Sequence, residues 1–204
     1  MPPEDTAPDS ADDPRPETLK VDRRLSVVAT LLFCTALGMV GVAAPLAALA
    51  VGISATVIGV VVALAGVSQL ATRLCMGPLL RRFPDKLFVV LAAVALAASC
   101  GLLVTSTAVW AFTLSQLLQG LARALFWTGS QTHAVRAWPS AVSGLSVINV
   151  ANGAGSLVGP ALAGLLAVQS LQLPLLVAAV AGALGVVPAM LLVRLAPFPS
   201  RPKG

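Results

Sequence analysis

A chain of 204 residues with 57% hydrophobic and only 10% charged residues does not resemble a soluble domain, in which roughly 25% of residues are charged. Its basic residues are sparse and scattered, so they form no clustered face for a phosphate backbone, and no nucleic-acid partner is expected. No motif of a hydrolase nucleophile, a zinc site or a phosphate loop is present. We therefore expect neither catalysis nor a metal site nor a cofactor.

Residues 1–24 are acidic, rich in proline and nearly free of large apolar side chains. Seven of the eight acidic residues of the chain lie in its first 22 residues. Such a composition cannot bury enough apolar surface to fold, so this segment is predicted to be a disordered tail. It is not a secretory signal, because a signal peptide begins with a short basic region. A short basic tail is expected at residues 197–204.

Residues 25–196 contain six apolar stretches, each of about 20 residues or more, which is the length a helix needs to cross a bilayer. The predicted spans are Ser26–Leu49, Thr56–Met76, Leu87–Ser106, Val109–Gln131, Ser143–Gln169 and Leu173–Leu195. Lipid offers the backbone no hydrogen-bond partner, so each span must be a helix or part of a closed barrel. Continuous apolar runs without two-residue alternation exclude the barrel. The sequence thus predicts an all-α membrane protein that spans the lipid bilayer.

Charge alternates between the connections of these spans. Basic residues precede the first span, separate the second from the third and the fourth from the fifth, and follow the sixth. They are Arg23, Arg24, Arg81, Arg82, Lys86, Arg136, Arg194, Arg201 and Lys203. The other connections, near Gly52, Thr107 and Ser170, carry no charge. Positive residues collect on the cytoplasmic side, so both termini are predicted to be cytoplasmic in a multi-pass protein of the plasma membrane.

A polar stripe follows one face of the fourth span. Its members recur every three or four residues and are Thr113, Gln116, Gln119, Arg123, Trp127 and Ser130. Arg123 lies about two-thirds of the way across the bilayer, where an arginine costs about 3 kcal/mol on insertion scales unless it faces water or a partner. We interpret Gln116, Gln119 and Arg123 as the lining of a substrate pathway. Alternatively, Arg123 extends towards the cytoplasmic headgroups.

Other polar residues of the spans leave two interpretations open. Asn149 and Asn152 on the fifth span could line the same pathway, or they could form hydrogen bonds that hold helices together. The only histidine, His133, follows the fourth span and is interpreted as an interfacial residue rather than a proton relay.

Small residues recur every four positions on the fifth span, at Gly155, Gly159 and Ala163. They form a flat ridge against which a neighbouring backbone can pack closely. Pro160 cannot donate a hydrogen bond to the preceding turn and is predicted to bend the helix. We interpret Gly155, Gly159, Pro160 and Gly164 as a conformational hinge. The alternative is a tightly packed, kinked helix that does not move.

The segment between the second and third spans resembles a signature of the major facilitator superfamily, Gly-x-Leu-x-Asp-Arg-x-Gly-Arg-Lys. Gly77, Leu79, Arg82 and Lys86 match it, and Pro84 replaces the second glycine. Arg81 stands where the aspartate is usual, and Asp85 replaces the first residue of the closing basic pair. In the family, the aspartate helps to latch the two halves of the transporter together. The latch thus lacks its usual aspartate here, and Asp85 could restore the charge pair from a shifted position.

Two further motifs carry the same resemblance, which covers about residues 25–196. The run from Gly155 to Gly164 is similar to the fifth-span motif of the drug:proton antiporter branch, with Ala163 in place of one glycine. Gln116-x-x-Gln119-Gly120 is similar to the family's Arg-x-x-Gln-Gly. The arginine of that motif is absent, but Arg123 follows on the same helical face.

The resemblance implies half of a major facilitator fold, with six transmembrane helices arranged as two inverted three-helix repeats. It implies transport of a small-molecule substrate by alternating access, with efflux as one direction, in a half-size or truncated transporter. A second six-helix half, from a separate chain or a homodimer partner, would complete the cavity. The alternative function is that of a non-transporting membrane protein: a truncated remnant, an assembly partner or an anchor.

Overall fold

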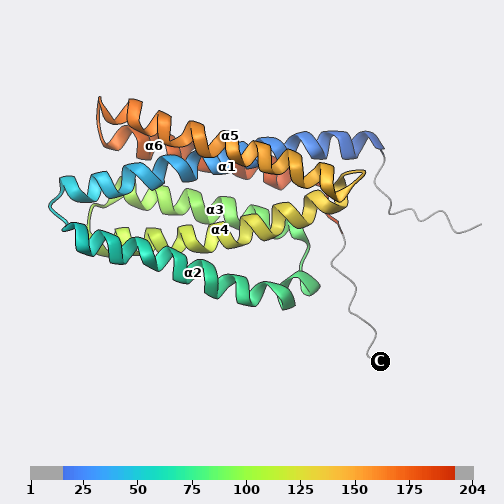
Figure 1. Ribbon diagram of the computed structural model, residues 1–204, viewed down its shortest axis with the longest axis horizontal. Coiled ribbons are helices and arrows are strands. Elements are labelled where there is room, and N and C mark those ends of the chain that lie inside the picture. The colour runs from blue at the N-terminus through green and yellow to red at the C-terminus, as the bar shows by residue number, and fades with distance from the viewer. Residues whose placement is uncertain (1–15, 196–204) are drawn as a thin grey trace, which may run out of the picture.

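The computed structural model describes residues 16–195, which form six helices joined by short connections (Figure 1). The helices are α1 (Pro16–Ala50), α2 (Ala55–Arg82), α3 (Asp85–Thr105), α4 (Val109–Ala137), α5 (Ala141–Ala167) and α6 (Gln172–Leu191). The prediction of an all-α fold is confirmed. Five helices are long and apolar enough to cross a membrane, and α4 is the exception among the described helices. Its glutamines, its histidine and its two arginines dilute its apolar residues.

Helix α1 begins well before the first predicted span. Residues 16–24, which the sequence assigns to a disordered tail, are helical, so that part of the prediction is wrong. The physical reason is that Asp22 and Ser26 are buried against the rest of the bundle, which holds the first turns of α1 in place. The rest of the predicted N-terminal tail and the whole predicted C-terminal tail lie outside the described residues, which end at Leu195.

The connection between α2 and α3 consists only of Phe83 and Pro84. A proline disfavours the helical conformation of the residue before it, and Phe83 accordingly adopts φ −124° and ψ 145°. The sequence predicts a connection over residues 77–86 between the second and third spans, and this prediction is wrong because the connection is shorter. Arg81 and Arg82 belong to the last turn of α2, whereas Lys86 belongs to the first turn of α3.

The six helices form two groups of three. In one group α1 packs against α5 and α6, and in the other α4 packs against α2 and α3. The contact between α3 and α6 joins the groups, together with smaller contacts from α4 to α1 and α5. Glycines allow close approach at these crossings. A Cβ atom on Gly120 of α4 would meet the α2 backbone at Ala65, and one on Gly182 of α6 would lie 3.3 Å from Ala97 Cα on α3.

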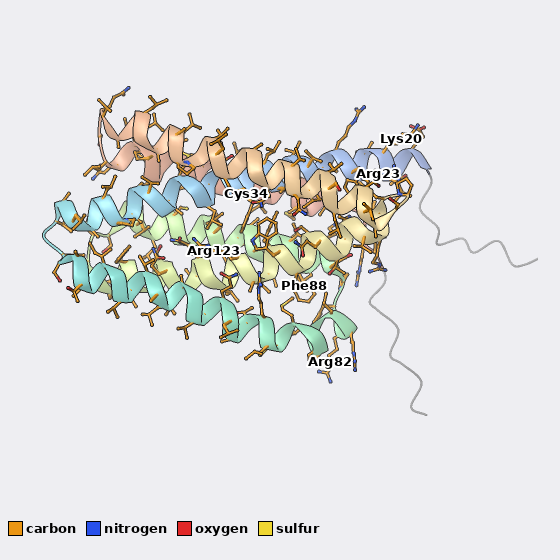
Figure 2. All side chains as sticks on the ribbon, in the orientation of Figure 1. Lys20, Arg23, Cys34, Arg82, Phe88 and Arg123 are labelled. Atoms are coloured by element: carbon orange, nitrogen blue, oxygen red, sulfur yellow. The ribbon has the colours of Figure 1, made fainter. Side chains whose placement is uncertain are left out.

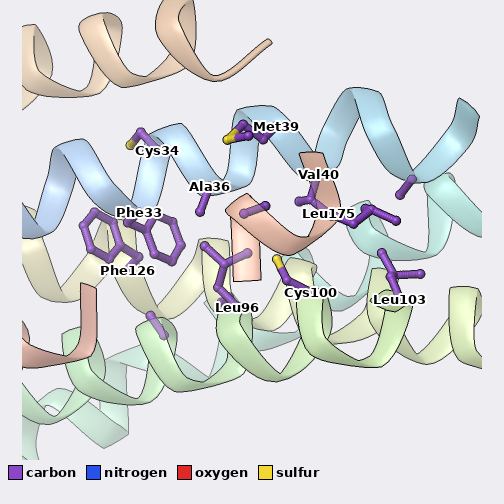
Figure 3. Close-up of a cluster of buried hydrophobic side chains, with 14 of the residues drawn as sticks. Phe33, Cys34, Ala36, Met39, Val40, Leu96, Cys100, Leu103, Phe126 and Leu175 are labelled. Carbon is purple, nitrogen blue, oxygen red and sulfur yellow. The ribbon is translucent and has the colours of Figure 1, made fainter. Parts of the chain in front are cut away.

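The core lies where the two groups meet (Figure 3). Phe33 of α1 stacks on Phe126 of α4, with ring centroids 3.9 Å apart and planes 4° from parallel. Small and medium side chains of α1 and α3, such as Met39, Leu96 and Cys100, fill the space beside them. Because lipid gives little hydrophobic drive between helices, this close packing contributes much of the cohesion of the bundle.

The helix ends that carry charged side chains all lie at one end of the bundle. We call this the basic end: it holds the start of α1, the α2–α3 and α4–α5 connections and the end of α6 (Figure 1). The connections at the opposite end, residues 51–54, 106–108 and 168–171, carry no charged side chain. The alternation of charge along the sequence thus corresponds to two distinct ends of one bundle.

Candidate functional site

A seam of glycines joins α5 to α1. A Cβ on Gly155 would lie 2.7 Å from Cys34 Cβ, and one on Gly159 would lie 2.5 Å from the Thr35 carbonyl oxygen. On the α1 side, a Cβ on Gly38 would lie 2.8 Å from Pro160 Cδ. The predicted ridge for a neighbouring backbone is confirmed at this glycine seam, which we define as Gly38, Gly155 and Gly159. Gly164 is exposed and faces open space, so it is not part of the seam.

The two glutamines of α4 face the interior of the bundle. Gln119 is fully buried, and its Nε2 donates a hydrogen bond to Ser115 Oγ at 3.0 Å. Ser115 in turn shares a hydrogen bond of 2.8 Å with Ser99 Oγ on α3. Gln116 is also buried. In this structure Gln119 reaches the Ser115–Ser99 contact between α4 and α3, although Gln119 Oε1 is buried without a hydrogen-bond partner among the described residues.

Arg123 lies near the middle of the length of α4 and of the bundle (Figure 2). Its side chain is partly buried. Its Nε is buried without a hydrogen-bond partner, and the guanidinium forms no ion pair with any residue between 16 and 195. A charged side chain that is withdrawn from solvent normally lies beside water, a partner or a ligand. Arg123 is therefore an unpaired cation that the described bundle itself does not satisfy.

The two asparagines of α5 differ in their surroundings. Asn149 is exposed, whereas Asn152 is partly buried. Asn152 Oδ1 accepts a hydrogen bond from Ser156 Oγ at 3.1 Å and a weak one from Cys34 Sγ at 3.4 Å. Asn152 thus joins α5 to α1 in this structure, beside the glycine seam. Of the five predicted pathway residues, Gln116 and Gln119 are thus buried, Arg123 and Asn152 are partly buried, and Asn149 is exposed.

Four ionisable residues form a buried charge cluster at the basic end: Asp22, Asp85, His133 and Arg136. His133 Nε2 lies 2.7 Å from Asp22 Oδ2, and its Nδ1 lies 3.4 Å from Asp85 Oδ2. Arg136 Nη1 lies 3.5 Å from the same oxygen of Asp85. Asp22, Asp85 and His133 are each 1–2% exposed. The cluster therefore links side chains of α1, α3 and α4.

Backbone groups complete the cluster. Asp22 Oδ1 accepts a hydrogen bond of 2.7 Å from the Val193 amide, which adds the end of α6 to the connected helices. Asp85 Oδ1 accepts one of 2.9 Å from the Lys86 amide. Because a carboxylate only accepts hydrogen bonds, Nε2 carries the proton in the bond with Asp22, and Nδ1 can form an ion pair with Asp85 only in the protonated imidazole. The carboxylates of Asp22 and Asp85 then balance the positive charges of His133 and Arg136, so the cluster has no net charge.

His133 follows Gln131, where the predicted fourth span ends, so it lies outside that span. Burial by itself lowers the pKa of an imidazole, but the hydrogen bonds and charges of Asp22 and Asp85 outweigh burial here. Together they raise the pKa of His133 from 6.5 to about 9. The ring is therefore charged at neutral pH.

The sequence model of the Major Facilitator Superfamily matches residues 27–204. The chain belongs to the major facilitator superfamily. None of the curated proteins matches it. Members of the superfamily are transporters rather than enzymes, and the apolar helices agree with a multi-pass membrane protein.

The superfamily signature between the second and third spans has an unexpected arrangement here. Gly77 faces open space, and Arg81 and Arg82 are exposed at the end of α2. Asp85, by contrast, is buried and bound to its own bundle. Because Pro84 starts α3 at Asp85, the carboxylate points towards α4. Asp85 is therefore not available in this structure to pair with a second half, contrary to the expectation from the sequence.

Sequence reasoning missed the buried charge cluster. It assigned Asp22 to a tail, Asp85 to a loop and His133 to the membrane interface. One signal was present: Asp22, Ser26 and Thr30 recur every four residues, and all three are buried on one face of α1. A lone acid that continues a polar stripe into an apolar helix indicates a buried partner.

Proposed function

We propose that this chain is a six-helix half of a major facilitator transporter, with both termini cytoplasmic in the plasma membrane. In this proposal α4 also crosses the bilayer. Its 29 residues exceed the length required for a span. Its polar residues are tolerable because α4 is enclosed by α2, α3, α1 and α5 and exposes little of them to lipid.

The pairwise packing supports two inverted three-helix repeats. Exchanging α1 with α4, α2 with α5 and α3 with α6 turns each main contact into another main contact. The pair α1–α5 becomes α4–α2, α1–α6 becomes α4–α3, and α3–α6 becomes itself. An internal two-fold relation of this kind is what inverted repeats produce.

The proposed activity is the movement of a small molecule by alternating access, and the unpaired guanidinium of Arg123 is the observation that carries it. An unpaired cation at mid-depth requires water or an anionic group. We propose that Arg123 faces the substrate route and that the substrate is polar or anionic. Gln119 acts in this proposal as a support between α4 and α3 through Ser115 rather than as a direct substrate contact, and Gln116 is buried on the same helix.

The glycine seam supports the proposed hinge. Without side chains between them, α5 and α1 meet backbone to backbone, so they can tilt without displacing large side chains. Gly155, Gly159 and Pro160 belong to this hinge, whereas Gly164 is on the exposed side of α5. The resemblance of this helix to the drug:proton antiporter branch makes efflux the proposed direction.

In this proposal a second six-helix half would enclose the route. Helices α2 and α5 are the least buried of the five apolar helices, so they offer the largest free surfaces for it. Since Asp85 is bound within this half, the contact between halves must use other groups. Arg81 and Arg82, exposed at the end of α2, are the proposed substitutes.

Transport is testable in vesicles reconstituted with the chain, alone and with a candidate second half. The probes are carboxyfluorescein as an organic anion and ethidium as an organic cation. We expect protein-dependent flux of the anion that falls at least tenfold in Arg123→Gln. Arg24→Gln, which removes the same charge from an exposed position near the start of α1, is the matched control and should retain the flux. Equal flux in Arg123→Gln and the native protein would contradict the proposed route.

One observation favours the alternative of a non-transporting membrane protein. Gln116 and Gln119 are buried among the helices of this half, so they line no open route in this structure. Cross-linking in the native membrane separates the two functions. A chain that cross-links to neither a second copy nor a second half would support the alternative, because transport requires a complete cavity.

A further inference from the structure

An open groove lies at the basic end between α3 and α6. It has a volume of about 450 Å³. Its lining consists of Phe83, Pro84, Lys86, Leu87, Val90, Met190 and Arg194. Most of these side chains are apolar, and the two exceptions are both cations. We call it the α3–α6 groove.

The two cations of the groove have no acidic partner among residues 16–195. The nearest acid in sequence, Asp85, is committed to His133 and Arg136 on the other side of α3. Its contact with Lys86 is to the backbone amide and leaves the ammonium group free. Lys86 and Arg194 therefore present uncompensated positive charge beside an apolar wall.

An apolar track continues from the groove along the bundle. Leu91 and Val94 of α3 are 45% and 47% exposed, and Leu184 and Val187 of α6 are each 55% exposed. All four lie farther from the basic end than the cations on their respective helices. The surface therefore offers, in order along the bundle, two cations, an apolar groove and an exposed aliphatic track.

We propose that the α3–α6 groove binds one anionic membrane lipid. Its phosphate lies between Lys86 and Arg194, and an acyl chain follows the aliphatic track. A phospholipid has a charged headgroup followed by long apolar chains. This order matches the two cations, the apolar groove and the aliphatic track of this surface. Basic pockets between transmembrane helices bind anionic headgroups in this manner. The inference requires only that the chain lies in a membrane and does not depend on transport.

A second groove at the basic end makes a useful comparison. It has a volume of about 420 Å³ and lies between α1 and α5, with Arg23, Arg24 and Trp138 in its lining. There, however, Arg23 Nε already donates a hydrogen bond of 2.8 Å to the Ala137 carbonyl, and its guanidinium lies over the Trp138 ring. Since one of its two cations is already engaged, the α3–α6 groove is the better anion site.

Native mass spectrometry of the detergent-solubilised chain tests the proposal with phosphatidylglycerol and phosphatidylcholine of identical acyl chains. Each cation near a headgroup favours the anionic lipid by about fivefold, so two favour it by about thirtyfold. We expect the double variant Lys86→Gln/Arg194→Gln to lose most of this preference. The control Arg81→Gln/Arg82→Gln removes two exposed charges from the same end and should keep it. No preference in the native chain, or equal loss in both variants, would overturn the proposal.

Tryptophan quenching locates the acyl chain independently. In nanodiscs, a tryptophan introduced by Val94→Trp should be quenched more by phosphatidylglycerol with brominated chains than by the matching phosphatidylcholine. Adding Lys86→Gln/Arg194→Gln should abolish the difference, while circular dichroism verifies that each variant remains helical. Equal quenching by the two lipids before the charges are removed would show that no anionic lipid occupies the track, and so would refute the site.

Discussion

Protonated His133 should stabilise the basic end of the bundle in a pH-dependent manner. A pKa raised from 6.5 to about 9 corresponds to about 3 kcal/mol of folding free energy. Because the pKa is higher in the folded state, this stabilisation is complete below pH 6.5. It declines as the pH rises and is lost once the pH passes about 9.

The change that tests this is His133→Gln, which retains a polar side chain of similar reach but cannot carry a charge. It leaves Asp22 without its cationic partner and Asp85 with only Arg136. Removing one partner of a buried pair costs about 3–5 kcal/mol, so the unfolding midpoint should fall by roughly 6–20 °C near neutral pH. The exposed pair of Lys20 and Glu17 supplies the control: Glu17→Gln should change nothing measurable.

Thermal unfolding in detergent, followed by circular dichroism from pH 6 to pH 10, measures both effects. The native chain should lose stability steadily between about pH 6.5 and pH 9, and His133→Gln should be flat over that interval. If the native midpoint did not change with pH, or if His133→Gln retained the same slope, the assignment of a charged histidine between two carboxylates would be refuted.

Two further predictions concern the packing of α5 and α4. Gly159→Ala places a Cβ 2.5 Å from the Thr35 carbonyl oxygen and should destabilise the chain by about 1–3 kcal/mol in the same unfolding assay. Gly164→Ala, in open space, should have no such effect, and equal losses would contradict the glycine seam. Gln119→Leu should change stability by less than about 1 kcal/mol, because the substitution removes one hydrogen bond within α4 and also a buried Oε1 that has no described partner; a loss of several kcal/mol would disprove this.

The sequence predicts well those features that depend on neighbours along the chain. Apolar runs locate all six helices, because the length of a span is a local property. The small residues at Gly155 and Gly159 indicate a close contact, because a four-residue repeat lies on one helical face. Gly164 falls outside that repeat, and the structure accordingly leaves it exposed.

Features that depend on distant partners escape the sequence pattern. Asp22 is held by His133 and Val193, which are 111 and 171 positions away in the chain. Composition alone therefore assigned it to a tail. Similarly, the spacing of Gln119 on α4 reveals that it shares a face with Arg123 but not which helix covers it. The structure shows that Gln119 reaches α3 through Ser115, whereas Arg123 reaches no described partner.

The orientation of α4 tests the central claim most directly, because six crossings require this polar helix to span the bilayer. In a chain with Cys34, Cys75 and Cys100 replaced by serine, single cysteines are introduced by Thr107→Cys before α4 and Ser140→Cys after it. A membrane-impermeant maleimide applied to intact cells should label the Thr107→Cys variant. It should label the Ser140→Cys variant only after the membrane is permeabilised. Labelling of both in intact cells, or of neither, would contradict a half-transporter whose fourth helix crosses the membrane.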